Sequence, residues 1–354
     1  MLNSQFPYNE LPKLQDIVIE PERKLTEACG TCWKTLYQLH GFLEAFENGP
    51  INGDLLLLQL ADARHSFDLD KKPIAISRVF EAYSSENALG DDTLDTLFAF
   101  LAQYRQTDEI SLDTLSPAYL LSGRKKTGLS RDRKDINIRS YHTNLTLYTP
   151  PAQASVIKSL KEDLEYTFRN PRNEEGLIQM CLCHFQLRAL APYNALNDHA
   201  ARVFSQLWIK SLKLNFSFLP FSRIISENRE AYQLMMREVA GKGRYADWCL
   251  YLVQITTEAA TYLLARLKDI QSLRKNTYDL ITKYTEYPLP AELLGIVFSR
   301  PFIKPKYITE ALQCHRQTAY AYLGHMVRAG ILVEKRSGRE KLYLHKQLLD
   351  VLSN

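Results

Sequence analysis

The chain has 354 residues, of which 45% are hydrophobic and 24% are charged, so it can bury a large core and is not intrinsically disordered. Its net charge of +4 is too small to indicate a partner, and at roughly 100–200 residues per domain its length predicts two or three domains. No apolar run reaches the roughly 18 residues that a membrane-spanning helix needs, and the N-terminus lacks the pattern of a secretory signal. We therefore expect no membrane association and a cytoplasmic location.

The N-terminal third of the chain predicts helices. Apolar residues recur at spacings of three and four from Glu20 to Asn48, where Gly49-Pro50 ends the pattern. Ser111 is suited to cap the last helix of this region. The further helices expected here are Gly53–Arg64, Pro73–Ser85, Asp92–Tyr104 and Ser111–Leu121.

The six cysteines admit a structural or a metal-binding interpretation. Cys29 and Cys32 have the spacing of metal and redox motifs, and Cys181, Cys183 and His184 would supply further ligands. Cys29 and Cys32 also lie on the apolar stripe of the first predicted helix, and the one-residue gap between Cys181 and Cys183 suits a tetrahedral zinc ion poorly. We favour buried, reduced thiols and predict no metal site.

The helical pattern is interrupted after residue 121. Six Lys or Arg residues lie between Arg124 and Lys134, and this basic segment is either a solvated loop or a contact for a nucleic acid or an acidic partner. From Ile136 to Tyr148, β-branched and aromatic residues alternate with polar ones, which predicts a hairpin. The helices expected after it are Ala152–Arg169, Glu174–Leu190, Ala200–Leu214, Ser226–Val239 and Ala246–Leu273.

The C-terminal segment has a different character. Residues 287–354 carry ten Lys or Arg and five Asp or Glu, so all of the excess positive charge lies here. The pattern predicts helices at Ala291–Phe298, Lys306–Leu312 and His315–Ala329, and then two strands around a basic turn. This order resembles a winged helix-turn-helix domain.

The third of these helices would enter the DNA major groove, and the basic turn would contact phosphates. Winged helices also serve as protein-interaction or dimerisation modules, so DNA, a protein partner and a homodimer all stay open. The residues placed for DNA are Arg316, Gln317, Thr318 and Tyr320 on the helix and Arg336 and Arg339 in the turn.

The junction between the two central helices carries the most specific pattern. An apolar helix ends at Leu190, and Asn197 and Asp198 can cap the next helix, whose N-terminus is a natural anion site. Residues 191–202, A-P-Y-N-A-L-N-D-H-A-A-R, resemble the motif H-P-F-x-(D/E)-G-N-G-R-x-x-R of the Fic family, which transfers AMP from ATP to protein hydroxyls. Flanking segments extend the resemblance over nearly the whole chain.

The resemblance implies catalytic roles that this chain does not fill. Ala191 stands where the family has its general-base histidine, and Ala195 stands where the family has the acidic residue that holds Mg²⁺. His142, His184 and His199 are the histidines that could replace the base, although His184 falls at a packing position of the family. We therefore expect an inactive protein, with relocated catalytic groups as the alternative.

The same resemblance implies a weakened nucleotide site. Leu196 and Asp198 stand at the two glycines that wrap the phosphates, so a bulky side chain and a carboxylate occupy a place meant for anions. His199 stands at the first motif arginine. Pro192, Asn197 and Arg202 match the motif, and Asn197 and Arg202 are the residues that would still contact a nucleotide.

The family's inhibitory helix has a counterpart here. Its motif, (S/T)-x-x-x-E, is matched by Ser66 to Asp70, with an aspartate in place of the glutamate. Because the inhibitory acid pairs with the second motif arginine in the family, we expect Asp70 to approach Arg202. The alternative is an exposed acidic residue without a partner.

These observations predict a mainly α protein, a Fic-type helical bundle with a short β-hairpin flap, followed by a winged helix-turn-helix domain. The expected division is an N-terminal helical region at 1–110, a Fic core at 111–286 and the winged helix at 287–354. We expect a non-catalytic regulator that binds DNA or a partner, and the alternative is an active AMP transferase. ATP and Mg²⁺ are possible ligands by resemblance alone, and the flap would contact a protein target.

Overall fold

The computed structural model describes residues 3–20, 22–45, 51–69, 74–85, 94, 97–98, 101–102, 105–116, 136–171, 176–193, 196–216, 218–284, 291–337 and 340–354. The protein is mainly helical, with two small antiparallel sheets. Its helices before the C-terminal segment are η1 (Leu14–Asp16), α1 (Arg23–Glu44), α2 (Ile51–Leu69), α3 (Ile76–Ser85), α6 (Ala154–Arg169), α7 (Gly176–Leu190), α8 (Asn197–Ser211), α9 (Phe221–Glu227), α10 (Arg229–Lys242) and α11 (Tyr245–Tyr284).

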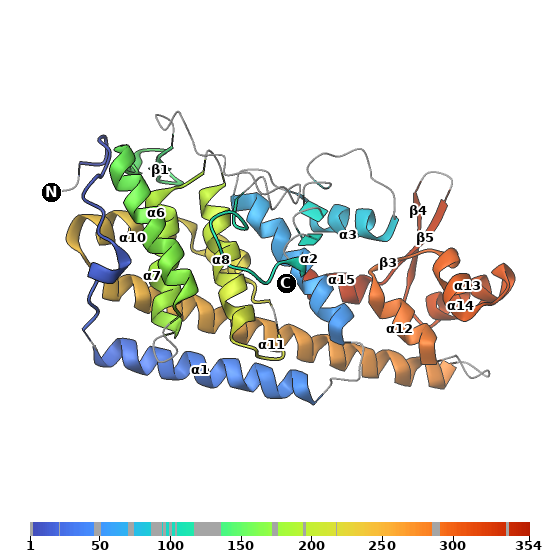
Figure 1. The fold of residues 1–354 in the computed structure, drawn as a ribbon. Helices are drawn as coiled ribbons and strands as arrows, with labels where there is room; N and C mark the ends of the chain where they lie inside the picture. Colours follow the sequence, from blue (N-terminus) through green and yellow to red (C-terminus); the bar gives the residue numbers. More distant parts are fainter. Residues whose placement is uncertain are drawn as a thin grey trace.

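Helix α11 organises the molecule. It has 40 residues, which at about 1.5 Å per residue makes it roughly 60 Å long. Helix α1 lies along one side of it, and α7 packs against its N-terminal half (Figure 1). Its other end contacts the C-terminal helices α12 and α15, so a single rigid element joins the helical core to the C-terminal domain.

Helices α7 and α8 form the centre of the core and are joined by the motif segment. Nearly every residue of α7 is buried, which agrees with its almost continuous apolar sequence. Helix α8 is buried from His199 to Ile209, so the polar residues within that range must find partners inside the protein.

The predicted hairpin is present. Strands β1 (Ile138–Arg139) and β2 (Thr146–Tyr148) pair in antiparallel fashion. Glu230, at the start of α10, accepts hydrogen bonds at its carboxylate from Ser140 Oγ at 2.8 Å and from the Tyr141 amide at 2.7 Å. The carboxylate therefore fixes the turn of the hairpin to the core, and neither this contact nor its partner is visible in the local sequence.

The C-terminal domain has the element order of a winged helix-turn-helix. Its sheet has the strand order β3-β5-β4, and the helix, turn and helix expected from the sequence are present. The short strand β3 and the last helix α15 are not foreseen by the sequence pattern. Its elements are α12 (Ala291–Ser299), β3 (Phe302–Ile303), α13 (Pro305–Leu312), α14 (Arg316–Arg328), β4 (Val333–Ser337), β5 (Glu340–Leu344) and α15 (Lys346–Ser353).

This domain packs against the core. Helices α12 and α15 contact α2, and β3 contacts α3. The Tyr307 hydroxyl donates a hydrogen bond to the Ser84 carbonyl, and Lys335 on β4 lies 3.8 Å from the Glu81 carboxylate on α3. Helix α2, which carries Ser66, is therefore shared between the motif region and the C-terminal domain.

Three predicted features of the helices are wrong. Residues 111–116 form a turn, because the Ser111 and Thr114 hydroxyls bond each other's main-chain amides instead of leaving them to a helix; residues 117–121 lie outside the described part. The helix expected at Ser226–Val239 is two helices, α9 and α10, divided at Asn228. The prediction that Asn197 and Asp198 cap α8 is also wrong, because no side chain caps that helix.

Within the described part of the chain, no helix combines the length and the apolar character needed to cross a bilayer. All six cysteines are free thiols, and four of them are buried. No group of three or more His, Cys, Asp or Glu side chains among the described residues is arranged to hold a metal ion.

Candidate functional site: the altered motif between α7 and α8

The motif segment is held in an unusual backbone conformation. Ala191 has a φ of 45° and Leu196 a φ of 59°, both in the left-handed region that favours glycine. Leu196 stands where the Fic pattern has a glycine, and it keeps the glycine-like conformation at some cost in strain. The loop backbone thus adopts left-handed angles at two positions that are not glycine.

Asn197 stabilises this loop rather than capping α8 as expected. Its side chain accepts a hydrogen bond from the Tyr193 amide at 2.9 Å and donates one to the Tyr193 carbonyl at 2.9 Å. Helix α8 begins at Asn197 itself, with Leu196 as its N-cap and no side chain capping it. The retained asparagine is therefore a structural residue that closes the loop on itself.

Asp198 forms an ion pair with a buried arginine that sequence reasoning missed. Arg188 Nε lies 2.7 Å from Asp198 Oδ1, and the Arg188 side chain is 0% exposed. The guanidinium also donates to the Tyr232 carbonyl at 3.2 Å and to Gln233 Oε1 at 2.9 Å. Burial by itself would raise the pKa of the Asp198 carboxyl, but Arg188 outweighs it and holds that pKa below its usual value.

The signal for Arg188 was present but ambiguous. It lies in the apolar sequence of α7, where a charged residue must find a partner if the helix is buried. The guanidinium stacks on the Tyr232 ring, 3.6 Å from its centroid. The local pattern could not tell that Asp198, ten residues further on, would be that partner.

His184, one of the three candidate replacement bases, is locked in the core. It is 0% exposed, and its ring nitrogens lie 2.7 Å from Ser205 Oγ and 2.7 Å from the Tyr232 hydroxyl. Burial lowers its pKa well below the usual value, with Arg188 and Arg202 adding to the effect. The expectation that His184 is a packing residue agrees with this geometry.

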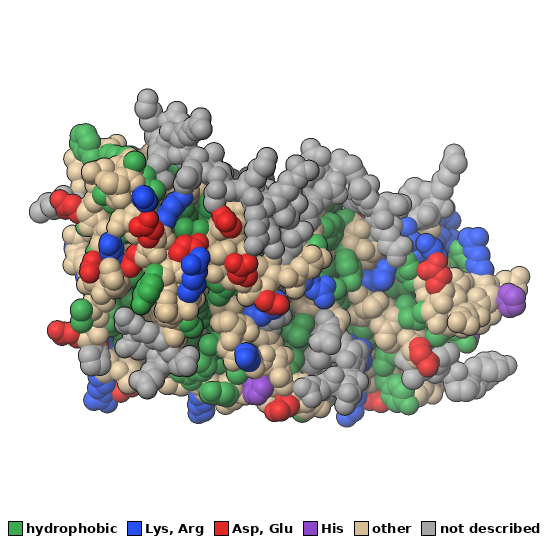
Figure 2. Space-filling model, viewed as in Figure 1, with side chains coloured by type: hydrophobic (Ala, Val, Ile, Leu, Met, Phe, Trp, Pro, Cys, Tyr) green, Lys and Arg blue, Asp and Glu red, His purple; other side chains and the backbone are tan. Residues whose placement is uncertain are grey.

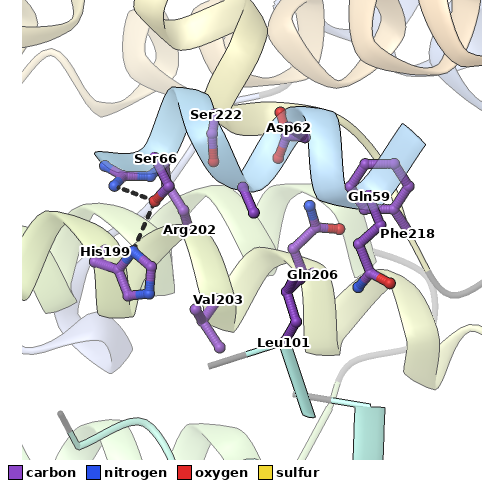
Figure 3. A pocket seen from close by; sticks show the side chains of 11 residues that line it. Gln59, Asp62, Ser66, Leu101, His199, Arg202, Val203, Gln206, Phe218 and Ser222 are labelled. Carbon is purple, nitrogen blue, oxygen red and sulfur yellow. Dashed lines mark hydrogen bonds between the residues drawn. The ribbon is translucent and has the colours of Figure 1, made fainter. Parts of the chain in front are cut away.

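Ser66, His199 and Arg202 form a buried cluster between α2 and α8 (Figure 3). Ser66 Oγ lies 2.7 Å from His199 Nδ1 and accepts a hydrogen bond of 2.8 Å from Arg202 Nη2. Because Arg202 donates to Ser66, the serine proton is available to His199, which stays neutral: burial lowers the pKa of His199 to about 3, with Arg202 adding to the effect. Ser66 of the inhibitory-like motif therefore contacts Arg202, whereas the predicted approach of Asp70 to Arg202 stays a prediction, because Asp70 lies outside the described residues.

This cluster faces a cavity that is too small for a nucleotide. The cavity measures about 30 Å³, room for a single water, and also contains Asp62 and Gln206. Asp62 is fully buried and accepts a hydrogen bond of 2.7 Å from the Arg223 amide. Burial raises the pKa of its carboxyl to about 7, although hydrogen bonds from Arg223 and Ser222 and the charge of Arg202 lower it.

A larger cleft lies on the flap side of the motif. It measures about 340 Å³ and is bounded by the hairpin, the motif loop and the start of α10. Ala191, Leu196, Asn197 and Asp198 line it, whereas His199 and Arg202 do not. His142 is exposed in the hairpin turn and is not among the lining residues either.

The cleft does not present the motif groups that would hold Mg²⁺ and a nucleotide triphosphate. Asp198, the motif carboxylate that lines it, is bound to Arg188, and Ala195 lies outside the described residues. Asp198 places a carboxylate beside the N-terminus of α8, but Arg188 pairs with it and Arg139 and Arg229 also line the cleft, so the charge of the lining does not exclude a phosphate. Arg202, the arginine retained from the motif, is turned to the other side of α8.

The residues predicted to contact DNA are partly available. Arg316 and Gln317 are exposed at the N-terminus of α14, while Thr318 and Tyr320 are half-buried. Arg316 donates a hydrogen bond of 3.2 Å to the Tyr320 hydroxyl. Arg336 on β4 is exposed, in a region where Lys and Arg side chains gather over β4 and β5 (Figure 2). Arg339 and the basic segment 124–134 lie outside the described residues.

The architecture is similar to that of known proteins. Residues 273–348 match the family described as Protein adenylyltransferase SoFic-like, C-terminal domain. The crystal structure of a Fic family protein from Desulfovibrio desulfuricans G20 matches with a TM-score of 0.57 and 14% sequence identity, over 92% of this chain and 97% of that chain. At this identity the structural match concerns the fold.

The helical core, the flap hairpin and the motif loop therefore define a protein of the Fic fold, extended by a C-terminal domain of the SoFic-like type. The chain therefore has the fold of a Fic family protein, in agreement with the motif resemblance. The division at residues 110 and 286 stays a prediction.

Proposed function

We propose that this Fic-domain protein is a non-catalytic regulator whose core no longer transfers AMP and whose C-terminal domain binds DNA. The non-catalytic half of the proposal rests on the position of the motif's anion-binding side chains, which do not line the cleft. Arg202 and His199 are buried against Ser66, and Asp198 replaces a glycine with a carboxylate held by Arg188. A phosphate in the cleft would meet no retained motif arginine, because the arginines that line it, Arg139, Arg188 and Arg229, lie outside the motif.

The loss of the base points the same way. Ala191 cannot accept a proton. His184 and His199 are buried, each has a pKa below its usual value, and each is bonded to other buried side chains. His142 does not line the cleft. A general base contributes roughly 10²–10⁴ in rate, and a single oxyanion donor about 10²–10³. Losing both groups removes most of what such an active site supplies.

The first test is calorimetric titration of ATP with Mg²⁺ into the purified chain, beside an assay for transfer of labelled AMP to protein. We expect no binding at millimolar ATP and no transfer. Ala191→His should stay inactive as well, because a restored base contributes only about 10²–10⁴ and the retained motif arginine, Arg202, still does not line the cleft. Tight binding of ATP, or transfer by the unaltered chain, would refute the non-catalytic half of the proposal.

The DNA-binding half is supported by the exposed basic residues of α14 and β4. Helix α14 buries Ala319, Leu323 and Met326 against the domain and leaves Arg316 and Gln317 at its exposed start. This is the part of a recognition helix that reaches base edges. A protein partner at the flap and a homodimer stay as further proposals of the sequence resemblance.

The matching experiment measures fluorescence anisotropy of a labelled duplex of mixed sequence at several salt concentrations. We expect binding that weakens with salt, and Arg336→Ala should reduce the slope of log affinity against log salt by about 1 if the residue neutralises one phosphate. Arg23→Ala makes the same charge change on an exposed residue of α1, and it should leave the slope unchanged. Equal slopes for all three proteins would argue against a DNA role for the wing.

A further inference from the structure

A second sizeable cavity lies away from the Fic motif. It measures about 460 Å³ and sits between the N-terminal segment, α1, α6 and α7. Its volume falls in the range of about 300–1,000 Å³ that is typical of small-molecule sites. The residues that form its apolar walls are Leu14, Ile17, Ile19, Leu25, Ile178 and Leu182.

Among the described residues, the lining of this cavity contains no charged side chain and no histidine. The other lining residues are uncharged, and they include the thiols of Cys29 and Cys183. The Fic cleft differs sharply, because Arg139, Arg188 and Asp198 line it. A charged ligand that moved from water into the 460 Å³ cavity would lose hydration without meeting a counter-ion among the described residues, which is costly in free energy.

The polar groups of the lining have mostly used their donors. The Thr26 hydroxyl donates to the Glu22 carbonyl at 3.2 Å, and the Thr167 hydroxyl donates to the Asp163 carbonyl at 2.8 Å. The Asn170 amide donates to the Tyr166 carbonyl at 2.7 Å. What these groups offer a ligand is therefore acceptor oxygen atoms, which suit a molecule with a hydroxyl donor.

The wall formed by the N-terminal segment is anchored, so the cavity is preformed. The Asp163 carboxylate accepts a hydrogen bond of 2.5 Å from the Leu14 amide. Gln186, on α7, donates one of 2.8 Å to the Pro12 carbonyl. A preformed site loses little conformational entropy when a ligand binds.

We propose that this cavity binds a small, neutral, mostly apolar molecule that carries a hydroxyl group, such as a medium-chain alcohol or a phenol. The volume sets its size, the uncharged lining sets its charge, and the acceptor atoms set its polar group. The site is distinct from the Fic cleft, and none of the motif residues lines it. Failure of this proposal would leave the proposed function untouched.

Binding is tested with Nile red, a neutral dye that brightens in apolar surroundings, titrated into the full chain. We expect saturable fluorescence that 1-decanol displaces and that decanoate displaces at least about tenfold more weakly, equivalent to about 1.4 kcal/mol. Equal displacement by the two would contradict the uncharged site, and absence of saturable binding would overturn the proposal.

The position of the ligand is tested through thiol protection. Cys29 lines the cavity and is half-buried, and Cys314 in the C-terminal domain is the other half-buried thiol. We expect 1-decanol to slow alkylation of Cys29 by N-ethylmaleimide and to leave the rate at Cys314 unchanged, as read by peptide mass spectrometry. Equal effects on both thiols, or none on Cys29, would place the ligand elsewhere and refute the assignment.

A matched pair of substitutions on α1 separates filling of the cavity from any general effect. Thr26 and Thr31 are both exposed and both donate their hydroxyl to the carbonyl four residues before, but only Thr26 lines the cavity. Thr26→Trp should weaken binding of Nile red by at least about tenfold, or about 1.4 kcal/mol, and Thr31→Trp should not. The proposal fails if the two folded variants bind equally well.

Discussion

Replacing Arg188 with methionine should destabilise the fold by about 3–5 kcal/mol, the usual cost of leaving a buried charge without its partner. The Arg188 side chain is 0% exposed, and its removal strands Asp198, whose carboxylate is only 32% exposed. It also removes the donors to the Tyr232 carbonyl and to Gln233. Urea unfolding followed by circular dichroism measures the effect.

A double variant provides the control for this prediction. In Arg188→Met with Asp198→Asn, no charge is stranded, so part of the lost stability should return, with a coupling energy on the order of 1–3 kcal/mol. If the two single substitutions add without coupling, the ion pair does not hold the motif loop. The proposed role of the Arg188–Asp198 pair in the altered motif would then be wrong.

The protein should lose stability between pH 7.5 and 5.5 because several of its histidines are buried in the neutral form. Burial lowers the pKa of His65 and His199 to about 3 and that of His345 to about 4, and His184 is also lowered. The unfolded chain takes up protons near pH 6.5, whereas the folded chain does not, so acid favours unfolding by about 1.4 kcal/mol per histidine over this interval.

Asp62 opposes this trend. Its carboxyl has a pKa of about 7 in the folded protein, mainly because of burial, so between about pH 4 and 7 the folded state holds a proton that the unfolded state releases. Its contribution to stability therefore grows as the pH falls through 7, by about 2 kcal/mol down to pH 5.5. The three histidines with pKa values of about 3 to 4 together cost about 4 kcal/mol, so with Asp62 included we expect a net loss of roughly 2 kcal/mol, and His184 adds to it.

Urea midpoints measured at pH 7.5 and 5.5 check this balance. Asp62→Asn should make the loss on acidification larger by about 2 kcal/mol, and His199→Asn should make it smaller by about 1.4 kcal/mol. The same stability at both pH values in all three proteins would mean that these groups are not buried in the states described.

Much of the fold is predictable from the sequence because its signals are local. Apolar spacing correctly indicates most of the helices, and the alternation at Ile136–Tyr148 indicates the hairpin. The errors occur where side chains compete with the backbone, as at Ser111 and Thr114, or where a strand of two residues, Phe302–Ile303, is too short to show a period.

The candidate site divides in the same way. The identities of Ala191 and Asp198 are enough to predict that the Fic chemistry is impaired, because they concern which groups are present. Which groups meet is a different matter. The sequence pattern does not single out Arg188, and it places His199 as a substitute base or a phosphate ligand, whereas His199 is bonded to Ser66, 133 residues away in the chain.

The sequence by itself therefore determined the helical class, the Fic-like motif with its missing base, and the excess positive charge of the C-terminal segment. Only the tertiary structure decided that Arg202 and His199 bond to Ser66 and that Arg188 neutralises Asp198. It also decided that a cavity whose described lining is uncharged lies between the N-terminal segment, α1, α6 and α7. The physical reason is that residue types and local periodicity are properties of neighbouring residues. The partner of a buried polar group is instead chosen by the packing of segments that are distant in the chain, where each such group must be satisfied.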